Sequence, residues 1–596
     1  MMATLRLLDL FNAIWLGLLF VMIFLWLPSR ILTTRSEEHS SIDLLVSGFA
    51  RIALITLLGV TALASLHLFN WFTLILLYSS WPLCYWLQRH RGRLQEVLKT
   101  HLQQLIFHIA DTIERFSLRQ WIYVRVHTRW RDGMQWLAAY LRQSNITTPT
   151  GMLAALALTI IFSLLLIIRF EEPLQQLRLG HPDSYQLLLE TRQLLSSDRP
   201  PGQPSLFSTI AAALVLIGSI EPMQVIRFLA PLLGCLLVLG VGYCVRALTE
   251  NGAAALIAIY SLGAYLFILP PPILTAQPQQ WELTWAVLSE SLHESLLRQW
   301  SGGNWELGVL FLLFALARMA RARKAHFDIA CCLIIVLLTA PVLLVVALAA
   351  KLTLILKREL ALAVTSIVWL GLALLTIVSE LPTILEKHGQ ILLLTLPAAL
   401  ALLCGLLFNL ASLFLHKISK DFAIRVEAIL FILFFAVSIN LISPPGTTGR
   451  YLEHDIVARK TLEIATRFPR KQWMIAAPVE QFAESYGTGW HKDLAQFVDE
   501  FSGRAGQADF RFPFSVKHLF VFVEKQPFAA FVNEPQSVPF SVLADATYRH
   551  YRSPAGRASL EFAVLELCEA YRRSHTDTTI YYEDELLRIY HFPLAQ

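Results

Sequence analysis

Charged residues are scarce in this chain. Of its 596 residues only 16% are Asp, Glu, Lys or Arg, against 55% that are hydrophobic. The mean hydropathy of +0.54 is too high for a soluble protein of ordinary surface, so the composition predicts a polytopic membrane protein. The net charge of +5 adds little, because the placement of Lys and Arg in the loops orients such a protein. We therefore expect no nucleic-acid binding.

Cysteine is scarce as well, with seven residues in the whole chain, and only Cys568 lies in the polar C-terminal part. No CxxC pair and no Cys/His metal spacing occurs, which excludes a disulfide framework and the common zinc motifs. Internal repeats and low-complexity tracts are also missing. The first apolar segment, residues 7–27, lacks a small-x-small cleavage site, so we expect it to remain as a membrane helix.

Apolar runs are abundant, and about eleven to twelve of them are near the ~20 residues that cross the hydrocarbon core of a membrane. Their positions predict N-terminal membrane helices in residues 1–87 and a transmembrane domain in residues 150–443. The stretch Thr339-Ala340-Pro341 favours a pair of short half-spans over one long span, because the next Lys and Arg residues then return to the cytoplasm. The predicted fold class is a polytopic α-helical membrane protein.

From Ser443 onward the composition is that of a soluble domain. Its apolar patterns predict a C-terminal α/β domain in residues 444–596. Strands are expected at 472–477, 518–523, 579–582 and 587–591, and helices at 452–467, 491–502 and 557–573. The placement of the spans puts this domain outside the cytoplasm, and the expected membrane is the bacterial inner membrane.

Residues 88–149 form a basic segment with ten Lys or Arg residues against four Asp or Glu residues. The positive-inside rule predicts that it is cytoplasmic. Apolar residues between Leu94 and Ile113 recur at helical spacing, which indicates an amphipathic helix on the inner leaflet. The sequence leaves two interpretations of this segment open. It binds membrane lipids or a protein partner, or it is a plain solvated basic face.

Ionisable side chains crowd the first outer loop, Arg169 to Arg192, directly after the apolar helix Met152 to Ile168. Such groups at a membrane exit are costly unless they have a function. A carboxylate there could take a proton from an acceptor, or hold a divalent metal that neutralises a pyrophosphate leaving group. Alternatively these residues solvate the loop, and Asp183 or Ser184 caps the helix that follows.

Asp183-Ser184-Tyr185 followed by Thr191-Arg192 resembles the first outer loop of the GT-C glycosyltransferase superfamily. The likeness is closest to the catalytic subunit of oligosaccharyltransferase, in which an Asp precedes a Thr-Arg pair at the same distance. It continues through Pro204 to Ile220 and through residues 227–248 and 251–267. The short paired helices near Pro341 are also similar to that family, so the resemblance covers roughly residues 150–443.

The resemblance implies transfer of a sugar or oligosaccharide from a polyprenyl-phosphate-linked donor to an acceptor on the non-cytoplasmic face. Asp183 then takes the place of the family's first acidic residue, as catalytic base or as ligand of Mg²⁺ or Mn²⁺, and Tyr185 belongs to the substrate loop. Candidates for a second acid are Glu282, Glu172 and Glu171. Candidates for binding the donor phosphate are Arg192, His181 and Arg227.

Each arginine also has a plainer interpretation. Arg192 could pair with Glu190 or Asp198, and Arg227 could be an interfacial anchor that snorkels. The second outer loop has no acidic DxE-like motif, and the C-terminal part has no WWD-type motif. A second hypothesis is therefore a non-catalytic membrane scaffold or assembly subunit that binds other proteins through residues 88–149 or the C-terminal domain. A transporter is less favoured, because no matched pair of broken helices occurs.

Overall fold

The structure is a computed structural model that describes residues 2–33, 41–89, 149–179, 182–196, 204–264, 285–289, 303–321, 325–378, 391–418, 453–478, 481–526 and 554–594, with the single positions 266, 282, 292, 426 and 429. The predicted basic segment 88–149 lies almost wholly outside these residues. The chain divides into two compact units, residues 75–165 and residues 1–74 with 166–596.

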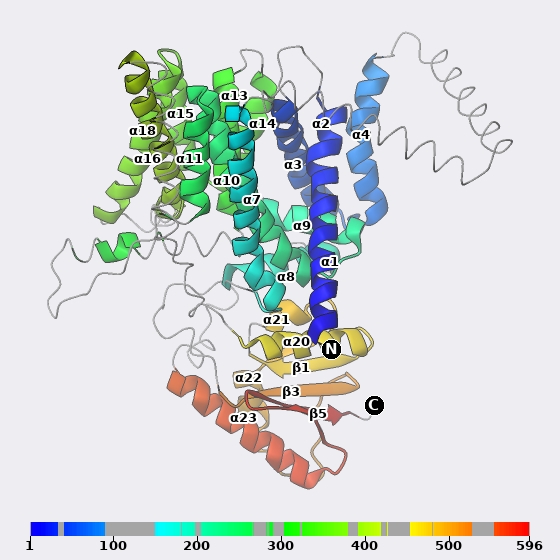
Figure 1. The fold of residues 1–596 in the computed structure, drawn as a ribbon. Coiled ribbons are helices and arrows are strands. Elements are labelled where there is room, and N and C mark those ends of the chain that lie inside the picture. Colours follow the sequence, from blue (N-terminus) through cyan, green and yellow to red (C-terminus); the bar gives the residue numbers. More distant parts are fainter. Residues whose placement is uncertain are drawn as a thin grey trace. The chain divides into compact units, whose positions relative to one another are not determined.

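Five of the described helical stretches are long and apolar enough to cross a membrane: Leu7–Ile31, Ser41–Ser65, Pro222–Thr249, Arg358–Thr376 and Leu396–Leu415. They belong to α1 (Met2–Phe20) with η1 (Val21–Trp26) and α2 (Leu27–Ile31), α3 (Ser41–Ser65), α10 (Pro222–Thr249), α16 (Arg358–Val378) and α18 (Leu396–Ile418) (Figure 1). This agrees with the predicted helical membrane protein.

The other helices among the described residues before residue 420 are shorter or carry polar ends. They are α4 (Trp71–Arg89), α7 (Pro149–Gln175), α8 (Pro182–Ser196), α9 (Leu206–Gly218), α11 (Gly252–Gly263), α13 (Asn304–Arg321), α14 (His326–Thr339) and α15 (Leu343–Leu354). The break between α14 and α15 falls at Ala340, where the sequence predicts a pair of short helices. Pro341 follows it and has no amide hydrogen to continue the helix.

Helix α10 is the most deeply buried of the five long helices, because 83% of its most apolar 18-residue stretch is buried inside the protein. It packs against α11 and α13, and two glycines allow close approach. A β-carbon at Gly240 would lie 2.7 Å from Leu310 Cδ1, and one at Gly242 would overlap Ile259 Cδ1. Close packing of side chains against α10 therefore organises this part of the protein.

Buried ion pairs join α3 to α13 and α14. Asp328 lies 2.7 Å from Arg51 and 3.3 Å from Arg318, and Asp43 lies 3.2 Å from Arg321. Both aspartates are in the first turn of their helix, and Arg318 and Arg321 are in the last turn of α13. Each charge is therefore complementary to its helix dipole. Helix α3 is thus tied to α13 and α14 by charge pairs.

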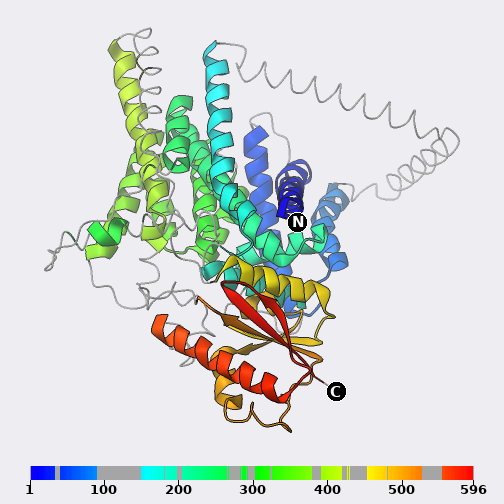
Figure 2. The same ribbon diagram turned by 60° about the horizontal axis from the view of Figure 1, so that its bottom comes forward.

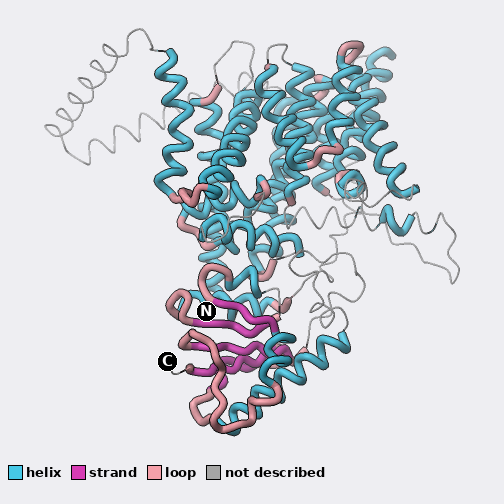
Figure 3. Tube along the Cα trace, turned by 180° about the vertical axis from the view of Figure 1, so that it is seen from behind, coloured by secondary structure: helices cyan, strands magenta, loops and turns pink. Residues whose placement is uncertain are grey.

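The C-terminal part contains a five-stranded sheet in the order β2-β1-β3-β5-β4. Its strands are β1 (Trp473–Ala477), β2 (Trp490–Asp493), β3 (His518–Glu524), β4 (Thr579–Glu583) and β5 (Leu587–Pro593). Strand β1 is parallel to both β2 and β3, whereas β5 is antiparallel to β3 and β4. All strands of the described residues gather in this sheet (Figure 3). The α/β arrangement and four of the five strands agree with the sequence prediction.

Helices cover both faces of the sheet (Figure 2). On one face α20 (Asp455–Arg467) packs through Val457 and Ile464 against Trp473, Phe520 and Ile589. On the other face α22 (Leu494–Phe501) and α23 (Pro554–Ser574) form a second core with alternate residues of the same strands. Successive side chains of each strand point to opposite faces, so the same strands contribute to both cores. This is expected for a sheet that is covered on both sides.

The predicted helix 491–502 is corrected at its start. Residues 490–493 form β2, which pairs in parallel with β1, and α22 begins only at Leu494. The carboxylate of Asp493 accepts from the amides of Ala495 at 2.9 Å and Gln496 at 3.3 Å, so it caps the helix there. Pairing with β1 therefore overrides the helical periodicity of the first three residues.

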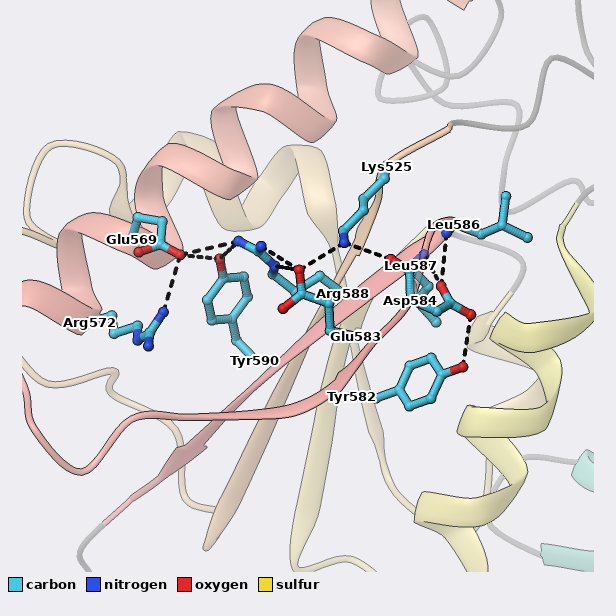
Figure 4. A network of polar contacts seen from close by, with 10 residues as sticks. All are labelled: Lys525, Glu569, Arg572, Tyr582, Glu583, Asp584, Leu586, Leu587, Arg588 and Tyr590. Carbon is cyan, nitrogen blue, oxygen red and sulfur yellow. Dashed lines mark hydrogen bonds and ion pairs between the residues drawn. The ribbon is translucent and has the colours of Figure 1, made fainter.

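An exposed polar network stabilises the β4–β5 hairpin (Figure 4). Arg588 donates to Glu583 at 2.5 Å, Lys525 donates to Glu583 at 2.8 Å, and Tyr590 donates to Glu569 of α23 at 2.5 Å. The hydrogen bonds from Lys525 and Arg588 lower the pKa of Glu583 to about 2. The network links the hairpin to α23 and to the end of β3, so we interpret it as structural.

Candidate functional site

Helix α8 carries most of the residues that the sequence singles out. It begins at Pro182, whose fixed φ angle suits the first turn of a helix, so Asp183 lies in the first turn. A carboxylate is electrostatically favoured at that end of a helix. The side chain of Asp183, and His181 as a whole, lie outside the part of the chain that the structure describes.

Tyr185 of α8 contacts the C-terminal part. Its hydroxyl donates a hydrogen bond to the carboxylate of Glu453, just before α20, and neither side chain is exposed. The other oxygen of Glu453 accepts from the amide of Gln481 at 2.5 Å. Gln481 opens the short helix α21 (Gln481–Ser485). The tyrosine that the sequence assigns to a substrate loop is therefore part of a buried contact.

Glu453 is close to a second buried carboxyl, that of Glu484 in α21. Burial raises the pKa of Glu453 well above its usual value, and the neighbouring Glu484 raises it further. Burial likewise raises the pKa of Glu484 to about 7, against lowering effects of Glu453, Arg192 and Thr461. Two adjacent buried carboxyls cannot both ionise without a large cost, so the pair holds a proton near neutral pH.

Arg192, near the other end of α8, is buried and internally engaged. Its guanidinium donates to Glu221 at 2.6 Å and to the main-chain carbonyl of Tyr486 at 3.0 Å. The sequence suggested Glu190 or Asp198 as the ion-pair partner of Arg192, but the observed partner is Glu221. Glu190 instead accepts from Ser208 at 2.9 Å, and Asp198 lies outside the described residues. The physical reason is that Glu221, the N-cap of α10, faces the last turns of α8.

Arg227 of α10 is also internally engaged. It lies 2.9 Å from Asp9 of α1 and donates to the carbonyl of Gln176 at 3.3 Å. Only 4% of its surface is exposed, so it does not snorkel to an interface. Both arginines proposed for the donor phosphate thus have internal partners.

The link between α7 and α8 is held by the start of α20. The carboxylate of Asp455 accepts from the main-chain amides of Leu177 and of Arg178, the latter at 3.1 Å. Arg178 in turn donates to the carbonyl of Glu453 at 3.1 Å. Together with Tyr185 and Arg192, these contacts fix the loop before Asp183 and the helix after it to residues 453–486.

The candidate second acids lie in different surroundings. Glu171 is exposed near the end of α7, where its carboxylate accepts from Gln175 at 3.4 Å, and Glu172 is half-buried. Glu282 is buried, with 9% of its surface exposed. Within the described ranges, no group of three His, Cys, Asp or Glu side chains is arranged to hold a metal ion.

Sequence reasoning did not select several buried acidic residues. Glu453 and Glu484 read as surface residues of a polar domain, and no local pattern marks their contact. Glu306, in the first turn of α13, is buried and borders a small recess with Trp305 and Thr395. A buried carboxyl at the start of an apolar helix is the signal that could have found Glu306.

The Tyr486-Gly487-Thr488-Gly489-Trp490 cluster has a structural role. Gly487 adopts a positive φ of 78°, which favours glycine. A β-carbon at Gly489 would lie 2.5 Å from the Trp473 ring. The two glycines let this loop turn tightly over β1 and present the Tyr486 carbonyl to Arg192.

No known protein family, curated protein or solved structure matches the chain.

Proposed function

We propose that this protein transfers a sugar or oligosaccharide from a polyprenyl-phosphate-linked donor to an acceptor on the non-cytoplasmic face of the membrane. The single observation that carries the proposal is the placement of Asp183. It lies in the first turn of α8, which follows the apolar helix α7 and is fixed to residues 453–486 by Tyr185 and Arg192. A rigid element with a carboxylate at its start is what positioned acid–base chemistry requires.

The proposed step uses Asp183 as a general base. A hydroxyl or amide of the acceptor attacks C1 of the donor sugar, and its proton passes to the carboxylate. The bond between C1 and the phosphate oxygen breaks, and the phosphate leaves with the polyprenyl chain. Glu306 is added to Glu282, Glu172 and Glu171 as a candidate for the second acid, because it is buried at the start of the apolar helix α13.

A transfer assay tests the proposal. The full chain in proteoliposomes receives radiolabelled polyprenyl-diphosphate N-acetylglucosamine or polyprenyl-phosphate mannose, with membranes of the source organism that lack the protein as acceptor. We expect Asp183→Asn to lower transfer at least about a hundredfold, the range of a general base. The matched control is Gln186→Ala, an exposed position of the same helix, which should leave transfer unchanged. Equal transfer by both variants would refute the role of Asp183.

The internal partners of Arg192 and Arg227 favour a second candidate, a non-catalytic assembly subunit with the same fold. Because both guanidinium groups already have carboxylate partners, neither depends on a donor phosphate for charge compensation. This candidate predicts that Asp183→Asn copurifies the same subunits as the unchanged chain. It also predicts that neither donor is consumed by either protein, which separates it from the transferase.

A further inference from the structure

The contact between α8 and residues 453–486 has two adjacent carboxyls at its centre. Glu453 is fully buried and Glu484 is 2% exposed. Glu453 receives hydrogen bonds from Tyr185 and, at 2.5 Å, from Gln481. Glu484 lies one helical turn after Gln481 in α21, and its buried carboxylate oxygens have no hydrogen-bond partner among the described residues. Three helices, α8, α20 and α21, therefore meet at this pair of acids.

Positive charge near the pair is already compensated. From α8 the facing groups are Tyr185 and Arg192, and the guanidinium of Arg192 pairs with Glu221 at 2.6 Å. From the α7–α8 link Arg178 donates to the main-chain carbonyl of Glu453, not to its carboxylate. Glu221 also acts on Glu484 as a second negative charge. Ionising both carboxyls would therefore leave uncompensated negative charge in a dry contact.

We propose that Glu453 and Glu484 form a proton-operated joint between α8 and the α/β part. With one proton on the pair, only one carboxyl is charged, and Tyr185 closes the contact. When both ionise, their repulsion loosens α8 from α20 and α21. This inference does not rest on the proposed function, because its readout is the docking of α8 and not transfer.

The direction with pH follows from proton linkage. Burial raises the pKa of both groups, that of Glu484 from 4.5 to about 7, so the docked state binds more protons than the undocked state. Docking is therefore strongest below about pH 4.5 and weakens as the pH rises toward 7. A pKa that rises from 4.5 to about 7 changes the docking equilibrium by roughly three hundredfold, since one pKa unit corresponds to tenfold.

Hydrogen exchange of the full chain in nanodiscs tests the joint. Protection factors of the α8 amides, corrected for intrinsic exchange, are measured from pH 5.5 to pH 8. We expect at least about a tenfold loss of protection over this range. Glu484→Gln and Glu453→Gln each remove one charge and keep a hydrogen-bonding group. Each should therefore reduce the pH dependence, while burial still raises the pKa of the carboxyl that remains. Two variants are used so that one that fails to fold leaves the test intact.

The matched control is Glu500→Gln, because this glutamate pairs with Lys492 on the exposed side of α22. It should show the same pH dependence as the unchanged protein. The proposal is overturned if Glu484→Gln retains the full pH dependence, or if the unchanged protein has none. It is also overturned if 5 mM Ca²⁺ or Mg²⁺ restores protection at pH 8 in the unchanged protein but not in Glu484→Gln. That result would make the pair a cation site.

Discussion

The hydroxyl of Tyr185 donates to the carboxylate of Glu453, which lies 268 residues further along the chain. This hydrogen bond joins α8 to the α/β part. Both groups are buried, so the bond also satisfies a carboxyl that water cannot reach. The position of Asp183, two residues before Tyr185, depends on this contact.

Replacing Tyr185 by Phe should destabilise the contact. The change leaves Glu453 with one donor fewer, and an unsatisfied buried acceptor costs about 1–3 kcal/mol. We expect a lower midpoint in thermal unfolding of the detergent-solubilised chain. Tyr582→Phe is the control, because its hydroxyl bonds to Asp584 on the hairpin, where water can replace it. If both variants unfold at the same temperature, the buried bond contributes nothing.

Arg192→Ala should act on stability and not on donor recognition. Glu221 is left without its partner in a partly buried position, and breaking such a pair costs about 2–3 kcal/mol. The expected result is a lower unfolding midpoint with an unchanged KM for the donor among molecules that remain folded. A KM that rises at least tenfold with unchanged stability would instead assign Arg192 to the donor phosphate.

Asp328→Asn should destabilise the helical part much more than Glu250→Gln. Asp328 pairs with Arg51 and with the buried Arg318, which is left with only the more distant Asp43 at 3.7 Å, so its loss should cost about 3 kcal/mol. Glu250 pairs with Arg358 at an exposed site, where a salt bridge contributes about 0–1 kcal/mol. Unfolding of both variants under one detergent condition compares them directly. Equal loss would show that the network at Asp328 is not desolvated.

Removal of divalent ions tests the predicted Mg²⁺ or Mn²⁺. If Asp183 holds such an ion, EDTA should abolish transfer and either metal should restore it. Transfer that persists in EDTA would leave Asp183 with the role of a base alone.

Glu306→Gln is informative in the same assay, because loss of transfer with unchanged folding would support Glu306 as the second acid.

The sequence predicts the parts of the fold that depend on local pattern. Apolar length defines the membrane helices, and periodicity predicts β1, β3 and the β4–β5 hairpin. Strand β2 is missed, because it has only four residues and owes its conformation to pairing with β1. Tertiary pairing of this kind overrides local propensity.

The candidate site is predicted only in part. The position of Asp183 near the start of a helix follows from the loop sequence, and the buried contacts of α8 do not. Arg192 pairs with a residue 29 positions away, and Tyr185 with one 268 positions away. Acidic residues such as Glu453 and Glu484 look like surface residues until the fold brings them together. Long-range contacts carry no signal in a single sequence.

The most direct test of the central claim compares lipid-linked glycan precursors in cells that lack the gene and carry one plasmid-borne form. We expect the unchanged chain and Gln186→Ala to restore the glycan product. Asp183→Asn, at equal abundance in the membrane, should instead accumulate the polyprenyl-linked donor, as measured by mass spectrometry of the lipid extract. Full restoration by Asp183→Asn, with no accumulated donor, would contradict the assignment of this protein as a glycosyltransferase that acts through Asp183.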